Sequence, residues 1–435
     1  MKRVSTLLFF VLALALSVNA NSNKEASAKD VVEVNIFQFK VEIAAELDAA
    51  ARLYESTHPG VKIVIETVGG GDDYGAALRA KNASGNMADI YNIGGPQDVK
   101  DWMTMLEDLS DQPWVSSAMD GILSGVTVDN KIYGLPFNME GYGFAYNKRI
   151  FKDAGIDASK IVDFKSLEAA AAALDQKIKS GALADKYPLL EAVFEYAAKE
   201  TWVTGLHTSN LALSPELGNV IAAADAKTID FKYADGLKKL LDLQAKYSSS
   251  ADKPSLLNAV DYSTQVDTGL AIERVAIIQQ GNWIYGGVSA VDKEVADNLG
   301  FLPMPIVGAK EDSIAVGVPM HWSINSKAEA ADKAAAKDFL NWLYTSEAGK
   351  DIVVNKFFFI PPLKGYDAYP VKDALGQSIM AFAAQGKTVP WVFMGYPTDW
   401  GMSTLGVKIQ AYYAGELTWD KVVAESKTEW ELSRK

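Results

Sequence analysis

The chain has 435 residues, 49% hydrophobic and 22% charged, which is enough for about two or three domains with sizeable cores. Its formal net charge of −13 argues against nucleic acid and anionic membranes as partners, because both are bound by basic surfaces. With 0 cysteines it has no disulfide, thiolate nucleophile or Cys-ligated metal, and 3 histidines give little support to a histidine-rich metal site or a Ser-His-Asp triad.

Residues 1–20 have the pattern of a cleaved secretory signal peptide. Lys2 and Arg3 precede the apolar run Leu7–Leu16, and a small residue, Ala20, stands at the expected cleavage position. The apolar run is short for a membrane span, and no cysteine follows it to carry the lipid of a bacterial lipoprotein. We therefore expect an exported, soluble, periplasmic protein in which residues 21–30 form a disordered leader.

Strand and helix patterns alternate in the first quarter of the chain. Strands are predicted at Val31–Phe39, Val61–Val68 and Ala88–Ile93, and helices at Ile43–Ser56, Tyr74–Lys81 and Val99–Leu109. This alternation is typical of α/β units around a largely parallel sheet.

Ligands of such sheets bind beyond the carboxyl ends of the strands, which here are the loops at 37–40, 69–73 and 92–98. The glycine-rich loop matches neither a dinucleotide fingerprint nor a phosphate loop, since no lysine follows at the needed spacing. The polar candidates for ligand contact in these loops, each of which is otherwise a solvated loop residue, are Gln38, Lys40, Asp72, Asp73, Asn92 and Gln97.

The segment Lys131–Ile156 is a strand-like run interrupted by proline and glycine. Pro136 ends the regular ladder, Glu140 is an isolated acid, and the aromatic run that follows predicts a helix ending near Gly155. Such a segment is either a chain crossing between two lobes, with Glu140 as a ligand contact, or a surface turn within one domain.

The rest of the chain continues the mixture of helices and short apolar strands. Helices are predicted at Phe164–Lys179, Ala192–Ala198, Phe231–Tyr247, Ala328–Tyr344, Leu405–Tyr413 and Trp419–Trp430, and strands at Val275–Ile278, Leu299–Pro305 and Val316–Ser326. The segment Val389–Trp400 is aromatic and loop-like.

Five segments, taken in order, resemble one family: IYGLPFNMEGYGFAYNKRIFKDAGI, RVAIIQQGNWIYGGV, LGFLPMPIVG, VGVPMHWSINSKAEAADKAAAKDFLNWLYTSEAGKDIV and GVKIQAYYAGELTWDKVVAES. Behind a signal peptide, this order is similar to the extracellular solute-binding proteins of bacterial ATP-binding-cassette (ABC) importers, in the sugar-binding group typified by maltose-binding protein. The resemblance covers almost all of the mature chain.

The resemblance implies a periplasmic-binding-protein fold of two α/β lobes, each a mainly parallel sheet flanked by helices, that close over a sugar. The lobes would comprise residues 31–138 plus 305–345 and residues 139–304 plus 346–435. Chain crossings would fall near Asn138–Tyr142, Leu302–Pro305 and Ser346. It also implies a monomeric, non-enzymatic receptor without a cofactor that delivers its sugar to the transmembrane subunits of an ABC permease.

Sugars offer flat C–H faces to aromatic rings and hydroxyl rims to carboxylates and amides. The family places a stacking tryptophan at the motif of Asn282 and Trp283, a glutamate at the position of Glu140, and another aromatic residue near Asp399 and Trp400. Further candidates are Trp391, Glu195 and Trp202. Side chains alternate along a strand, so one of His321 and Trp322 should face the cleft and the other the core. We expect His321 to face the cleft. The loop after Ile93 lacks the tryptophan that the family often has there, so the identity of the sugar cannot be copied.

Two alternatives stay open at this point. A secreted glycoside hydrolase also combines paired carboxylates with aromatic residues, although no acid and nucleophile pair can be recognised. The same receptor fold could instead bind a polyamine or a phosphate ester. The abundance of tryptophan with mixed acids and amides favours a neutral carbohydrate.

Overall fold

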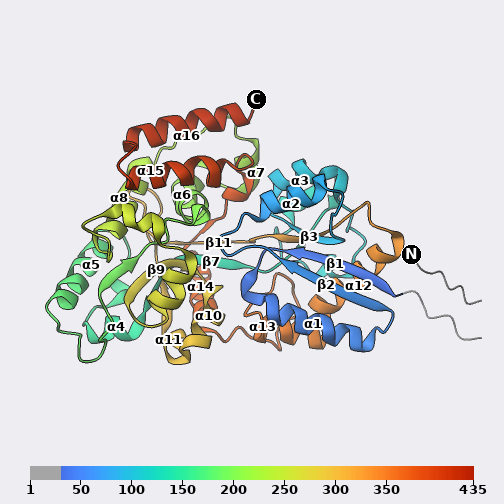
Figure 1. The fold of residues 1–435 in the computed structure, drawn as a ribbon, viewed down its shortest axis with the longest axis horizontal. Helices are drawn as coiled ribbons and strands as arrows, with labels where there is room; N and C mark the ends of the chain where they lie inside the picture. Colours follow the sequence, from blue (N-terminus) through green and yellow to red (C-terminus); the bar gives the residue numbers. More distant parts are fainter. Residues whose placement is uncertain (1–30) are drawn as a thin grey trace, which may run out of the picture.

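The computed structural model describes residues 31–435, and the expected signal peptide and leader, at 1–20 and 21–30, lie outside the described residues. Two lobes lie side by side, each with a sheet flanked by helices (Figure 1). The prediction of a two-lobe α/β fold is therefore confirmed.

The first lobe holds a five-stranded sheet in the order β2-β1-β3-β12-β6. Strand β1 runs parallel to β2 and β3, while β12 is antiparallel to β3 and β6. Helix α1 buries a stripe at Leu47, Ala50, Ala51 and Tyr54, the spacing of one helical face, against this sheet. The bounds in this lobe are β1 Val32–Gln38, α1 Ala44–Thr57, β2 Val61–Thr67, α2 Tyr74–Ala83, β3 Ile90–Ile93, α3 Pro96–Trp102, β4 Thr127–Val128, β5 Lys131–Ile132, β6 Leu135–Pro136, β12 His321–Ile324, α12 Ala330–Thr345 and α13 Glu347–Asn355.

The second lobe is built around β7, whose eight residues are all buried. Its sheet has the order β13-β11-β7-β9-β8, with β10 also paired to β7. The bounds of its strands are β7 Glu140–Asn147, β8 Ala192–Glu195, β9 Val275–Gly281, β10 Leu299–Leu302, β11 Ile314–Gly317 and β13 Thr388–Pro390. The bounds of its helices are α4 Lys148–Asp153, α5 Phe164–Lys179, α6 Ser209–Leu217, α7 Val220–Asp225, α8 Ala234–Lys246, α9 Tyr262–Gln265, α10 Ile284–Val291, α11 Lys293–Asp297, α14 Ala374–Ala384, α15 Val407–Tyr413 and α16 Trp419–Ser433.

Strand direction in this second sheet differs from the prediction of a mainly parallel sheet. Strand β7 is antiparallel to β9, β10 and β11, and only the pairs β8–β9 and β11–β13 are parallel. The helix predicted just before Gly155 begins only at Lys148, because the preceding aromatic run is β7 itself. The helix predicted at Ala192–Ala198 is also wrong, since its first four residues form the buried strand β8, and so short an apolar run carries no helical period.

The chain crosses between the lobes three times, and only the first crossing lies where the sequence suggested. It falls between β6 and β7, at residues 137–139. The second lies at 318–320 rather than at Leu302–Pro305, because β11 pairs in the second sheet and β12 in the first. Pro319 separates them, so the single strand predicted at Val316–Ser326 is two strands in different lobes.

The third crossing lies well beyond Ser346. The hydroxyl of Ser346 merely caps α13, whose Val353 and Val354 pack in the core of the first lobe together with Tyr366. Helix α14 is the first later helix that packs on β7 and β10. Residues 305–317 therefore belong to the second lobe, and residues 346–366 pack mainly on the first, although Phe358 and Ile360 contact the core of the second.

Within residues 31–435, no helix combines the length and the apolar character that crossing a membrane requires.

Candidate ligand-binding site

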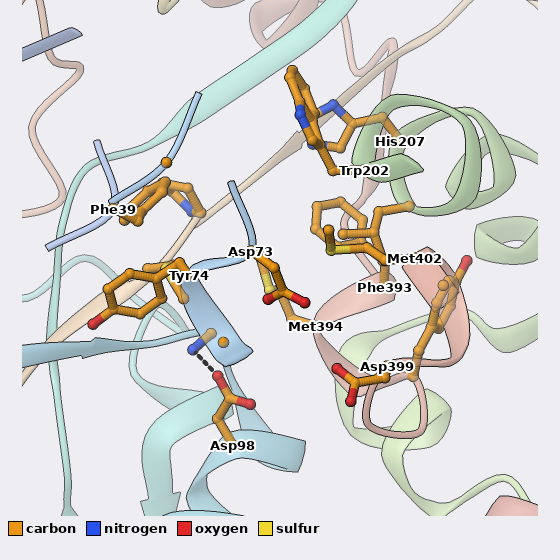
Figure 2. A pocket seen from close by; sticks show the side chains of 18 of the residues that line it. Phe39, Asp73, Tyr74, Asp98, Trp202, His207, Phe393, Met394, Asp399 and Met402 are labelled. Carbon is orange, nitrogen blue, oxygen red and sulfur yellow. Dashed lines mark hydrogen bonds between the residues drawn. The ribbon is translucent and has the colours of Figure 1, made fainter. Parts of the chain in front are cut away.

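A cavity of about 320 Å³ lies between the two lobes. The first lobe lines it with the loop after β1, the glycine loop before α2, and the starts of α2 and α3. The second lobe contributes the segments around residues 202–207, 283 and 391–402. Figure 2 shows Phe39 and Tyr74 on one side, facing Trp202, His207, Phe393 and Met402 on the other.

Aromatic rings form the wall on the second lobe. The ring of His207 lies 5.1 Å from Trp202, 5.4 Å from Trp283, 5.6 Å from Trp391 and 5.2 Å from Phe393, measured between ring centroids. Such faces can stack on the C–H faces of a sugar or on any flat apolar group.

A buried ion pair joins the lobes at the hinge side of the cavity. The Lys40 ammonium lies 2.5 Å from a Glu140 carboxylate oxygen, and the two side chains are only 4% and 3% exposed. Asn138, in the first crossing, donates to the same oxygen at 3.1 Å. Burial lowers the pKa of Lys40, but the Glu140 and Glu42 carboxylates outweigh burial, so the net pKa is raised and the ammonium stays charged.

Five carboxylates besides Glu140 line the cavity. They belong to Glu42, Asp72, Asp73, Asp98 and Asp399. Burial raises the pKa of Asp98 to about 6, although its carboxylate accepts the Gly94 N–H at 2.6 Å (Figure 2). The lining is therefore acidic.

Two π-helical turns, Trp202–Thr208 and Trp400–Gly406, pack against each other and supply part of the lining. They touch at Gly205, where an added Cβ would lie 1.8 Å from the carbonyl oxygen of Gly401. Only glycine permits this approach. Turns of this rare type occur frequently at functional sites.

Nine of the predicted contact residues line the cavity: Lys40, Asp72, Asp73, Gln97, Glu140, Trp202, Trp283, Trp391 and Asp399. Trp283 is half-buried and donates its indole N–H to Gln280 at 3.0 Å. Trp202 donates to Glu200 at 3.2 Å, and Asp399 pairs with Arg79 at 3.0 Å.

Three other predicted residues lie outside the lining in the second lobe. Trp400 is 1% exposed and donates to the Ser426 carbonyl at 2.8 Å, so it is part of the core. Glu195 is buried against Arg274 at 3.0 Å. Asn282 accepts the Gly141 N–H at 3.1 Å and so ties β9 to β7.

Three predicted residues of the first lobe also lie outside the lining and instead shape its loops. Gln38 accepts the backbone N–H of Lys40 at 2.6 Å, and Asn92 accepts that of Phe39 at 3.2 Å. His321 contacts the Gly94 carbonyl oxygen through Nδ1 at 3.0 Å, beneath the loop rather than in the cavity. We therefore leave all six out of the proposed contacts.

The residue patterns missed several lining side chains, foremost Phe39, Tyr74, His207 and Phe393. Met394 was also missed, although the glycines of the first lobe indicate its place. A Cβ added to Gly94 would lie 2.8 Å from the Met394 sulfur, so Met394 of the second lobe fills the space that this glycine leaves.

Within the described part of the chain, no group of three or more His, Asp or Glu residues is arranged to hold a metal ion.

Solved structures share this architecture. A chitin oligosaccharide binding protein is 22% identical, with a TM-score of 0.75 over 93% of this chain and 99% of its own. A solute-binding protein in complex with raffinose is 18% identical, with a TM-score of 0.71 over 93% of this chain and 100% of its own. At these identities the likeness shows the shared fold.

Sequence comparison identifies the family. An uncharacterized ABC transporter extracellular-binding protein of Pyrococcus horikoshii is 25% identical, over 81% of this chain and 78% of its own length. The model of the bacterial extracellular solute-binding protein family matches residues 38–350, well over half of the chain. The two lobes, the cavity between them and this match together place the chain in the family of bacterial extracellular solute-binding proteins.

Proposed function

We propose that this protein captures a neutral sugar between its lobes and delivers it to the transmembrane subunits of an ABC importer. The observation that carries the proposal is an interlobe cavity that is lined by aromatic rings and contains a salt bridge between Lys40 and Glu140, whose charges neutralise each other. Rings can stack on sugar faces, and the other carboxylates of the lining can accept hydrogen bonds from hydroxyl groups.

The position of Lys40 among the rings favours a neutral ligand over a polyamine, although the carboxylates elsewhere in the lining would attract a cation. The Lys40 ammonium lies 5.6 Å from the ring of Phe39 and 5.8 Å from that of Trp283. The position that a ligand cation would take among these rings is therefore occupied by a cation of the protein.

An anionic ligand such as a phosphate ester is disfavoured for the opposite reason. Five carboxylates besides Glu140 line the cavity, from Glu42 to Asp399. The guanidinium of Arg79 is engaged by Asp399 at 3.0 Å. An entering phosphate would meet like charges without a free basic partner among the lining residues.

The conformation is a closed one, because polar contacts join the lobes in addition to the chain crossings. Thr398 donates to Asp101 at 2.6 Å, and Arg434 donates to Gln97 at 2.6 Å. We propose that ligand contacts from both lobes favour this closed state over an open one. The permease subunits would then distinguish the closed, liganded receptor from the open one. Export through the signal peptide would place the monomer in the periplasm, where it binds its sugar without hydrolysing it.

A thermal-shift panel tests the proposal. It compares raffinose, N,N′-diacetylchitobiose and maltose with spermidine and glycerol 3-phosphate, because a ligand at 100 times its Kd stabilises the native state by about 2.7 kcal/mol. We expect at least one neutral sugar to raise Tm saturably and to remain intact after long incubation. Shifts caused only by spermidine or glycerol 3-phosphate would contradict the sugar proposal, and turnover of the sugar would contradict a purely binding role.

A further inference from the structure

We infer that the imidazole of His207 hydrogen-bonds one hydroxyl group of the bound sugar, and so selects for sugars that carry a hydroxyl group at that position. The inference rests on the proposed function. Its basis is a polar ring fixed in an aromatic wall of the cavity, with no hydrogen-bond partner for its imidazole among residues 31–435.

The position of the ring is fixed by its neighbours. It stacks on Tyr142 at a centroid distance of 4.4 Å and an interplanar angle of 10°. The hydroxyl of Tyr142 donates to the His207 backbone carbonyl at 2.8 Å, which anchors the π-helical turn on β7. A ring held on one face by Tyr142 presents its edge in a defined direction, as selection of a hydroxyl group requires.

The imidazole of His207 lacks a hydrogen-bond partner within residues 31–435, although the residue is only 9% exposed and lines the cavity. The other two histidines differ in that each has a carbonyl partner through one ring nitrogen, His58 with Tyr54 and His321 with Gly94, although Nε2 of His321 is buried and unpaired. The nitrogens of His207 still face the open cavity, so a ligand that displaces water there without a hydrogen bond would leave them unpaired, at a cost of about 1–3 kcal/mol. A ligand hydroxyl group in the cavity would supply the missing partner.

The chemistry of the ring fits a hydroxyl group. Burial, and after it the charge of Lys40, lowers the pKa of His207 to about 3, so the imidazole is neutral at physiological pH. A neutral imidazole has one donor and one acceptor nitrogen, and a hydroxyl group likewise both donates and accepts. The charged groups nearest the hinge, Lys40 and Glu140, are paired with each other.

The surroundings of His207 make this contact selective. The side chains around it are the rings of Trp202, Trp283, Trp391 and Phe393. A sugar without a hydroxyl group at this point would leave the imidazole buried and unpaired. Sites built to hydrogen-bond a substrate hydroxyl reject analogues that lack it far more strongly than apolar pockets reject an added group.

The test uses monodeoxy analogues of whichever of raffinose, N,N′-diacetylchitobiose and maltose binds the wild-type protein most tightly. Calorimetry should reveal one hydroxyl position whose removal weakens wild-type binding about tenfold or more. His207→Phe keeps an aromatic ring on Tyr142 but removes both nitrogens. It should bind the parent sugar about tenfold to a hundredfold more weakly and no longer distinguish the parent from that one analogue.

Two further variants separate recognition from folding. His207→Gln retains a donor and an acceptor and should keep part of the preference for the parent sugar. His58→Phe, at a histidine outside the cavity lining, should leave the whole analogue profile unchanged. The ratio of the two affinities does not depend on the fraction of protein that is folded, so a less stable His207 variant still reports on selectivity.

The possible results have distinct meanings. An unchanged analogue profile in His207→Phe, with parent affinity within about twofold of wild type, overturns the role of His207 but leaves the proposed function standing. Failure of all three sugars to bind the wild-type protein overturns both. Loss of discrimination at a single hydroxyl position in His207→Phe, and not in His58→Phe, supports the inference.

Discussion

The ion pair between Lys40 and Glu140 gives the sharpest prediction, since it lies in the cavity and joins the two lobes. Glu140→Gln keeps the shape and an amide oxygen but removes the negative charge, which leaves an ammonium that is 4% exposed without its counterion. Removing one partner of a buried pair costs about 3–5 kcal/mol. Part of this cost is recovered here, because the amide oxygen still accepts from Lys40 and because opening of the lobes would hydrate the ammonium.

We therefore expect Glu140→Gln to lower the free energy of unfolding by about 1–3 kcal/mol and to weaken sugar binding by at least about tenfold. The double variant Lys40→Met/Glu140→Gln leaves no unpaired charge, so its stability should return to within about 1 kcal/mol of wild type while sugar binding stays weak. Urea unfolding followed by tryptophan fluorescence and calorimetry with the best panel sugar measure both quantities.

The exposed pair Lys62–Glu33, at 2.9 Å, is the matched control, and Glu33→Gln should cost less than about 1 kcal/mol. The reasoning would be refuted if Glu140→Gln had wild-type stability and affinity. It would also be refuted if the double variant were less stable than either single variant, because the two side chains would then act independently.

Four other substitutions test separate parts of the structure. Trp283→Ala should weaken sugar binding by about 1–3 kcal/mol in calorimetry, the scale of a lost stacking face, and unchanged affinity would mean that Trp283 is only a wall residue. Trp400→Ala should instead lower the free energy of unfolding by about 3–5 kcal/mol, measured by urea titration, because it empties a core position. Arg434→Ala removes the hydrogen bond to Gln97 and should shift unliganded protein toward the open state, seen as a larger radius of gyration in X-ray scattering. Burial raises the pKa of Asp98 from 3.8 to about 6, so the folded state binds the extra proton and wild-type stability falls as pH rises from 4 to 6. Asparagine at position 98 does not titrate. The free energy of unfolding of Asp98→Asn relative to wild type should therefore be higher at pH 7 than at pH 4, by at most about 3 kcal/mol, and the Tm difference should be correspondingly larger at pH 7. An equal difference at both pH values would contradict the raised pKa.

Local sequence patterns predicted the first lobe better than the hinge, although the helix expected at Val99–Leu109 ends as α3 at Trp102. The alternating strands and helices before residue 110 have clear periods, and the Pro/Gly break near Asn138 marks the first crossing. The second crossing was misplaced because Val316–Ser326 looks like one strand, whereas the pairing of β11 with β7 depends on residues far away in the chain. Such long-range pairing has no local signal.

Some of the residues expected from the family resemblance line the cavity and others do not, and their contact with a ligand stays a prediction. Trp283 and Glu140 follow from motif position, and both line the cavity. Trp400 has the same composition around it, but its indole N–H is used by the Ser426 carbonyl, a partner that only the folded chain brings near. Tryptophan near an acid therefore does not by itself distinguish a ligand contact from a core residue.

The first π-helical turn explains why His207 escaped prediction. Trp202 and His207 lie five positions apart, which in an α-helix places side chains on different faces, whereas in this π-helical turn both residues line the cavity. The turn is held open by the contact of Gly205 with Gly401, about two hundred residues later in the chain. A sequence window around His207 contains neither the partner glycine nor the altered period. The residue for which we infer a role in hydroxyl selection is therefore one that the folded chain alone could identify.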